Sequence, residues 1–132
     1  MRSTQIPLFS PETEWVMPEE LKDLKGYKKI AIDLETNDPN LKDLGSGNVA
    51  GEGHIAGIAV AVEGWSGYFP VHHEQGGNMD RKLVFSWLQD ILNQVDTTFI
   101  FHNAMYDVCW LRKEGLSIKG HIVDTMIAAS LI

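Results

Sequence analysis

The feature that most constrains this chain is an apolar, strand-like stretch that ends in two carboxylates. It reads Lys-Lys-Ile-Ala-Ile-Asp-Leu-Glu-Thr, residues 28–36, and a turn-forming Asn-Asp-Pro-Asn run follows it. Its apolar first half is typical of a buried central β-strand. Because side chains alternate along a strand, we expect Asp33 and Glu35 on one face and Leu34 on the other. Two buried carboxylates would lose hydration and repel each other, and divalent cations would offset both effects.

The spacing of these two acids does not by itself establish a metal site. The 132 residues include 18 Asp and Glu, so about two such pairs are expected by chance. A second pair, Glu12 and Glu14, lies in a polar, proline-containing segment. The competing interpretation of Asp33 and Glu35 is a solvated strand end, at which Asp33 and Thr36 cap the following turn.

Composition narrows the class of protein. A chain of 132 residues with 44% hydrophobic residues is long enough for one domain with one core. The net charge of −7 argues against a protein that coats nucleic acid with basic residues, but not against an enzyme that meets phosphate through bound cations. The single cysteine, Cys109, excludes an internal disulfide and suits a reducing compartment. The sequence also lacks an apolar run of membrane-spanning length and a secretory signal pattern.

The hydrophobic pattern predicts an α/β fold. Residues 1–27 are expected to be a lead-in segment, either a partly ordered arm or one with a short helix opening at Pro18, and residues 28–132 form the domain. The elements expected after residues 28–36 are a long glycine-rich loop over 37–53, strands at 54–62 and 65–73, a helix from Asn78 or Asp80 to Val95, a strand at 97–101, a helix at 104–114, a strand at 117–123 and a helix from Asp124. This order predicts a mixed sheet, with an antiparallel three-strand meander, further parallel strands and flanking helices.

Polar side chains meet the core a second time after the strand at 97–101. Asn103 stands at a strand-to-helix junction, where it could cap the helix, and Asp107 follows one turn later on the same side. The alternative is that Asp107 merely complements the helix N-terminus with negative charge. If the strands at 28–36 and 97–101 are adjacent and parallel, their ends meet at one edge. Asp33, Glu35 and Asp107 would then converge.

Three segments carry a resemblance to a known family: Ile-Ala-Ile-Asp-Leu-Glu-Thr at 30–36, His-Asn-Ala-Met-Tyr-Asp at 102–107 and Asp-Thr-Met at 124–126. In this order they resemble the motifs of 3′–5′ exonuclease domains, in particular the proofreading domain of family A DNA polymerases of bacteria and phages. The resemblance implies a ribonuclease H-like fold and a two-metal nuclease of the DEDD type.

The resemblance also implies roles for individual residues. Asp33, Glu35 and Asp107 would be three of the four catalytic acids and would hold two divalent cations, Mg²⁺ or Mn²⁺. Asp33 would bridge both ions, and Glu35 and Asp107 would each hold one. The residues expected to contact the nucleic acid or support that contact are Thr36, Asn103 and Tyr106.

The family pattern places the fourth acid after Asp124, in a Tyr-x-x-x-Asp motif that does not occur after Asp107. We therefore expect this chain to stop inside the domain and to show little activity alone. A form extended through that motif should degrade DNA from its 3′ end. The implied partners are a single-stranded DNA 3′ end and a downstream polymerase domain, in the cytoplasm of a bacterial or phage-infected cell. The alternatives are a related exoribonuclease and a non-catalytic domain that binds a strand or a partner.

Two further groups of residues have weaker interpretations. His54, His72 and His73 lie at strand ends, but a single cysteine and irregular ligand spacing argue against zinc, and Cys109 is expected to be a structural thiol. A second group of aromatic side chains could stack on bases, although core packing is the preferred interpretation. These are Trp65, Tyr68 and Phe69.

Overall fold

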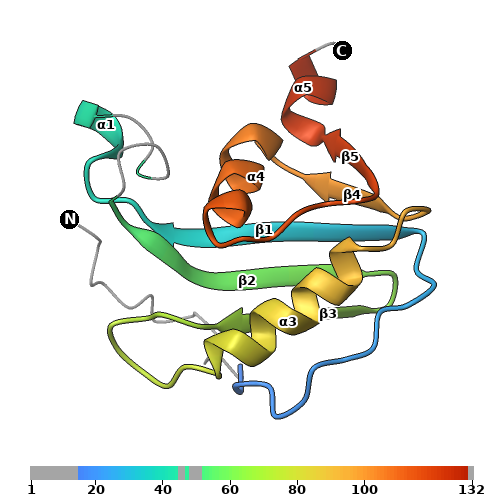
Figure 1. The fold of residues 1–132 in the computed structure, drawn as a ribbon, viewed down its shortest axis with the longest axis horizontal. Coiled ribbons are helices and arrows are strands. Elements are labelled where there is room, and N and C mark those ends of the chain that lie inside the picture. Colours follow the sequence, from blue (N-terminus) through green and yellow to red (C-terminus); the bar gives the residue numbers. More distant parts are fainter. Residues whose placement is uncertain (1–14, 45–46, 48–51, 131–132) are drawn as a thin grey trace, which may run out of the picture.

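The computed structural model describes residues 15–44, 47 and 52–130, which form a mixed sheet with α3 and α4 on one face (Figure 1). The strand order in the sheet is β3-β2-β1-β4-β5. The elements are β1 (Lys29–Asn37), α1 (Leu41–Leu44), β2 (His54–Val62), β3 (Trp65–Pro70), α3 (Arg81–Leu92), β4 (Thr98–Phe101), α4 (Ala104–Lys113), β5 (His121–Asp124) and α5 (Thr125–Ser130). Strand β2 pairs antiparallel with both β1 and β3, and β4 pairs parallel with both β1 and β5. The predicted α/β class and strand pattern are confirmed.

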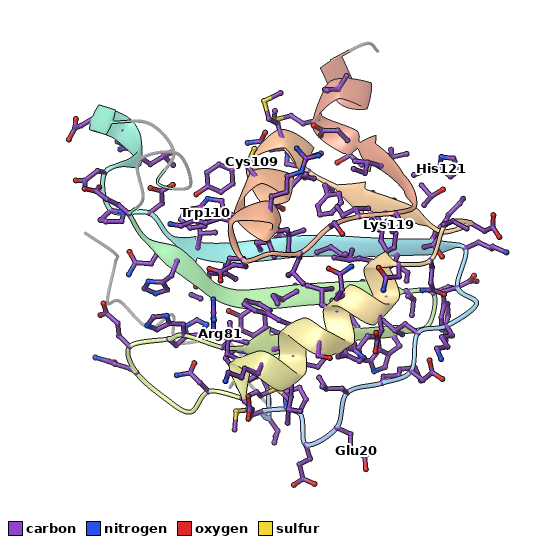
Figure 2. The ribbon with its side chains drawn as sticks, viewed as in Figure 1. Glu20, Arg81, Cys109, Trp110, Lys119 and His121 are labelled. Carbon is purple, nitrogen blue, oxygen red and sulfur yellow. The ribbon has the colours of Figure 1, made fainter. Side chains whose placement is uncertain are left out.

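Strand β1 separates a closed face of the sheet from an open face. Its buried residues Ile30, Ile32 and Leu34 alternate with more exposed ones. The buried set joins residues of α3 and α4 in one core, which includes the fully buried Trp110 of α4, whereas Glu20 projects into solvent (Figure 2). We call the helix-covered side the closed face. Asp33 and Glu35 lie on the other side and are exposed, so the expectation that both acids sit in the core is wrong. No helix of the described residues covers them.

The open face is lined by small residues. Ala31, Ala59, Ala61 and Gly67 border a cleft of about 620 Å³, and Asp33 lies on its wall. The segment that begins at residue 15 runs along this cleft before it turns to the closed side. There Leu24 is buried in the core.

The boundaries of several elements differ from those predicted. No helix forms at Pro18. Helix α3 is capped by Asp80, whose carboxylate accepts the N–H groups of Lys82 and Leu83, and it ends at Leu92, short of the predicted Val95. Strand β3 ends at Pro70, which has no N–H to continue the ladder.

The rest of the chain follows the predicted order, with shorter elements. Strand β5 begins at His121, later than predicted, and the short helix α1 occupies part of the loop expected over 37–53. Other parts of that loop, and residues 1–14, lie outside the described residues. None of the described helices has the length and apolarity needed to cross a membrane.

Candidate active site

The site forms where β4 stops and β1 continues. Pairing between these strands ends at Ala31 and Ile100, but β1 runs on to Asn37. Helix α4 begins just after β4 and brings Asp107 against the edge of β1 that β4 leaves free. Asp107 is only 4% exposed.

The environment of Asp107 disfavours its charge. Burial, and next the negative charge of Asp33, raise the pKa of this carboxyl to about 7, against a hydrogen bond from the backbone N–H of Leu34 that lowers it. One carboxylate oxygen, Oδ2, is buried without a hydrogen-bond partner among the described residues. An unpaired buried oxygen costs free energy. Binding of a proton or a cation by the Asp107 carboxylate would therefore be favourable.

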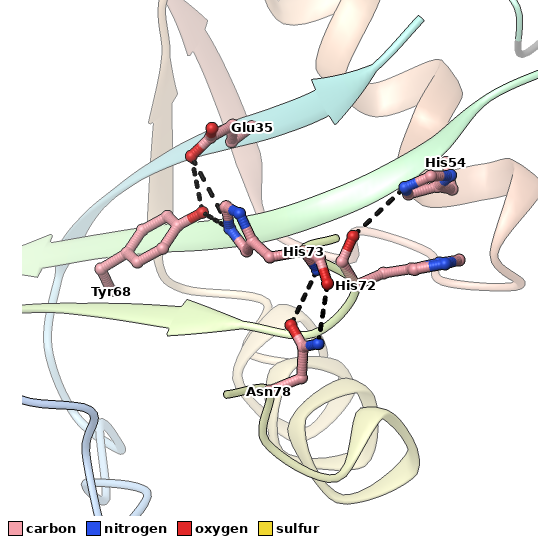
Figure 3. A network of polar contacts seen from close by, with 6 residues as sticks. All are labelled: Glu35, His54, Tyr68, His72, His73 and Asn78. Carbon is pink, nitrogen blue, oxygen red and sulfur yellow. Dashed lines mark hydrogen bonds and ion pairs between the residues drawn. The ribbon is translucent and has the colours of Figure 1, made fainter. Parts of the chain in front are cut away.

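Glu35 lies on the open face, and its carboxylate is already bound. Its Oε2 accepts a hydrogen bond of 2.6 Å from the hydroxyl of Tyr68 and lies 3.9 Å from Nε2 of His73 (Figure 3). Burial, followed by the hydrogen bond to Glu35, raises the pKa of Tyr68 well above its ordinary value, so the phenol stays protonated. The described residues contain no set of three His, Cys, Asp or Glu side chains gathered as a ready-made metal site. Asp33 and Asp107 are the part of the predicted site that the structure brings together.

Thr36 and Tyr106 are also brought together, as neighbours in a hydrogen-bonded chain. The Tyr106 hydroxyl donates to Oδ2 of Asp38 at 3.0 Å. Its 2.8 Å contact with Oγ1 of Thr36 must then use the phenol oxygen as acceptor, so Thr36 is the donor. Burial is the main cause that raises the pKa of Tyr106. This chain links α4 to the end of β1 beside Asp107.

Asn103 does not cap α4 as the sequence predicts. It takes the left-handed conformation, φ 70° and ψ 63°, and its side chain makes no capping bond. The carboxylate of Asp124 instead accepts the backbone N–H groups of Asn103 at 3.0 Å, Ala104 at 2.9 Å and Met126 at 3.0 Å. Partial burial pushes the pKa of Asp124 upward, but these hydrogen bonds hold it below its ordinary value. Asp124 thus accepts hydrogen bonds from backbone N–H groups at the start of both α4 and α5.

The contacts that link His73 and Tyr68 to Glu35 were not predicted, because the sequence suggested Tyr68 only as a possible base-stacking residue and His73 only as an unfavoured zinc ligand. Core packing holds for Phe69, which is 0% exposed, and Trp65 packs against the same core. Tyr68 points to the open face instead. No local pattern distinguishes it, because its role depends on a partner two strands away.

A second cleft lies beside Glu35. Its volume is about 420 Å³. At its wall the rings of His54 and His72 stack with centroids 3.7 Å apart, and burial, with the neighbouring His72, lowers the pKa of His54. Thr36 and Asp38 line it as well. Cys109 is a free, partly buried thiol on α4.

The chain matches characterised proteins along nearly its whole length. The model of a 3′–5′ exonuclease family, that of family A DNA polymerases, matches residues 10–132. A DNA-directed DNA polymerase of Pseudomonas phage M6 is 36% identical over 141 residues, which cover 100% of this chain and 21% of the phage protein. The chain thus spans about a fifth of that relative.

Solved structures share the fold. NrnC of Brucella melitensis with bound Mg²⁺ matches with a TM-score of 0.54 and 19% identity, over 80% of this chain and 45% of that one. The catalytic core of RRP6 from Trypanosoma brucei, mutant C496S, matches with a TM-score of 0.54 and 22% identity, over 79% of this chain and 25% of that one. The fold is ribonuclease H-like. By the family model and the phage relative, the chain belongs to the 3′–5′ exonuclease domains of family A DNA polymerases.

Proposed function

We propose that this domain hydrolyses phosphodiester bonds at the 3′ end of a DNA strand with the help of divalent cations held by Asp33, Glu35 and Asp107. The observation that carries the proposal is the buried, unpartnered Oδ2 of Asp107 beside the charge of Asp33. A cation placed there would satisfy the oxygen and remove the repulsion between the two carboxylates. The donor set fits Mg²⁺ or Mn²⁺, which prefer carboxylate oxygens.

Each side chain has a distinct task in this proposal. Two bound cations would activate water and stabilise the leaving 3′ oxygen. Asp33, Glu35 and Asp107 would hold these cations, with Asp107 presented by α4 and Glu35 by the open face of the sheet. Thr36, which lines the cleft beside Glu35, and Tyr106, which is hydrogen-bonded to Thr36, support the terminal nucleotide. Asn103, at the start of α4, steadies this arrangement or touches the strand.

The proposed substrate and partners follow from the relatives. The phage relative is a DNA polymerase. We therefore propose that the domain removes nucleotides from a single-stranded DNA 3′ end and works with a downstream polymerase domain of the same protein. Its proposed location is the cytoplasm of a bacterial or phage-infected cell. The Mg²⁺ of the NrnC structure supports a divalent cation in this fold. Bound cations would also reverse the repulsion between DNA phosphates and a chain of net charge −7.

Metal binding by the acids is tested by thermal unfolding with and without Mn²⁺. A ligand that binds only the folded chain stabilises it by about 1.4 kcal/mol at ten times its Kd, or roughly 5 °C for a domain of this size. We expect this shift in the parent and in Asp90→Asn, an exposed acid on α3. Asp33→Asn should abolish it. An equal shift in Asp33→Asn would contradict the metal site.

The reaction is tested with 5′-labelled oligonucleotides. We expect slow, Mn²⁺-dependent shortening of single-stranded DNA from the 3′ end, in steps of one nucleotide, lost in Asp33→Asn. An RNA oligonucleotide of the same sequence is the comparison. Faster shortening of RNA would replace DNA by RNA as the proposed substrate.

A further inference from the structure

The carboxylate of Glu35 is held by a side chain that reaches it across an intervening strand. Tyr68 is on β3, Glu35 is on β1, and β2 lies between them. In the ladder Tyr68 is opposite Ala59 and Glu35 is opposite Gly57. The Tyr68 hydroxyl nevertheless donates to Glu35 Oε2 at 2.6 Å. The phenol therefore passes diagonally over β2.

Gly57 provides the space for this crossing. A Cβ at Gly57 would overlap the hydroxyl and ring of Tyr68. Gly57 is not among the described glycines with positive φ, so its backbone conformation does not require glycine. What requires glycine here is the close approach of Tyr68.

His73 completes the arrangement behind Tyr68. The Tyr68 hydroxyl donates its one proton to Glu35. In its 2.6 Å contact with Nε2 of His73, the imidazole N–H is therefore the donor and the phenol oxygen is the acceptor. His73 is fixed in turn by Asn78, whose side chain accepts its N–H at 2.8 Å and donates to its carbonyl at 3.1 Å. Figure 3 shows the resulting row from Asn78 to Glu35.

We propose that Tyr68 and His73 are positioning residues that set the Glu35 carboxylate for cation binding. The inference rests on the cation site proposed above. The Glu35 side chain is 59% exposed, so without a partner it would sample several rotamers, and binding would have to order it. The hydroxyl occupies Oε2 and leaves Oε1 without a hydrogen-bond partner among the described residues, on the face shared with Asp33. Being neutral, it orients the carboxylate without cancelling its charge.

The test measures Mn²⁺ affinity of the 132-residue chain by electron paramagnetic resonance of free Mn²⁺, without any assay of activity. Tyr68→Phe removes only the hydroxyl, and residues that orient a metal ligand typically contribute 10–100-fold in affinity. We expect Tyr68→Phe to weaken binding about 10-fold. The matched control is Tyr27→Phe, since Tyr27 packs against the core and its hydroxyl makes no hydrogen bond among the described residues. Its affinity should equal that of the parent.

Further variants separate positioning from other roles. His73→Ala should lose less affinity than Tyr68→Phe, because it removes only the support of the hydroxyl. Gly57→Ala should match Tyr68→Phe, because the added methyl displaces the phenol. In a Glu35→Gln background, Tyr68→Phe should have no further effect, since the two residues act through one carboxylate.

Two outcomes would overturn the inference in distinguishable ways. If Glu35→Gln weakens Mn²⁺ binding but Tyr68→Phe binds as the parent does, or more tightly, Tyr68 does not position Glu35, and the proposed cation site stands. If neither Asp33→Asn nor Glu35→Gln changes binding, the cation site itself is wrong and the positioning role falls with it. The metal-free melting temperature of each variant shows whether lost affinity reflects lost folding.

Discussion

The closed and open faces of this sheet are built from neighbouring residues of the same strands, yet they have opposite compositions. On β1, Ile32 is 2% exposed while the next residue, Asp33, is exposed. On β2, Val60 is 1% exposed while Ala61 borders the open cleft. The closed face is filled by branched and aromatic side chains, whereas alanine and glycine leave a cleft of about 620 Å³ on the other. The closed face thus carries the packing that stabilises the fold, and the open face carries two acids of the proposed site.

The carboxylates on the two faces also differ in how far they are exposed to solvent. Asp33 and Glu35 are exposed to solvent on the open face. Asp107 reaches the same site from the closed side and is buried. The unfavourable electrostatics of the proposed site are therefore concentrated on one residue. Because Asp107 is buried, its charge makes the stability of the folded state sensitive to pH.

The largest effect on stability should come from truncating a buried side chain on the closed face. Leu88→Ala removes a fully buried side chain of α3 and should lower the free energy of unfolding by about 2–5 kcal/mol, through lost burial and a residual cavity. Leu83→Ala, on the same helix but 62% exposed, should change it by less than about 0.5 kcal/mol. Urea unfolding measures both. Equal losses would mean that the exposed side of α3 is packed as well.

The second prediction concerns the pH dependence of stability caused by Asp107. Its folded pKa of about 7 lies above the unfolded value of 3.8, so the folded chain binds the extra proton between these two values. Stability should therefore fall as pH rises from about 4 to about 7 and level off above it. Asp107→Asn lacks this titration. Relative to the parent it should gain on the order of 3 kcal/mol between pH 4.5 and pH 8 in EDTA, at about 1.4 kcal/mol per pKa unit.

Asp124 provides the control of opposite sign. Its folded pKa is lowered, so its contribution to stability is present above the unfolded value and is lost as pH falls through the folded one. Asp124→Asn should therefore destabilise the chain at neutral pH, and less so in acid. Urea unfolding at pH 4.5 and pH 8 tests Asp107, and unfolding at pH 3 and pH 8 tests Asp124, because the contribution of Asp124 is lost only below its unfolded value of 3.8. If Asp107→Asn shows the same pH trend as Asp124→Asn, Asp107 is not buried as described.

Sequence reasoning succeeded where local patterns decide the outcome. The apolar run of β1 and the spacing along α3 predict element type and order, and Asp80 is one of the two caps, with Asn78, that the sequence allows for α3. The prediction that Asn103 caps α4 was wrong, because the backbone N–H groups at the start of α4 bind the carboxylate of Asp124, at the end of β5. A backbone group bound by a distant carboxylate leaves no signature in the helix itself.

The exposure of Asp33 and the role of Tyr68 could not be predicted for a related reason. An apolar strand flanked by helices is expected to be covered on both faces, but the placement of both long helices on one side is a property of the fold. The crossing of Tyr68 over Gly57 joins three strands through their registers. A single sequence does not show those registers.

The smallest effect, and the sharpest test of the two faces, comes from adding carbon atoms at adjacent positions of β2. Val60→Ile enlarges a side chain in the filled closed face and should cost about 1 kcal/mol or more, because an overpacked core must shift rotamers or backbone. Ala61→Val adds two carbons beside the open cleft and should change stability by less than about 0.5 kcal/mol, since the added atoms meet space and valine suits a strand. Both variants are compared by urea unfolding under one set of conditions, in the absence of metal. A cost for Ala61→Val as large as that for Val60→Ile would show that the open face is packed in solution. The proposed difference in packing between the closed and open faces would then be wrong.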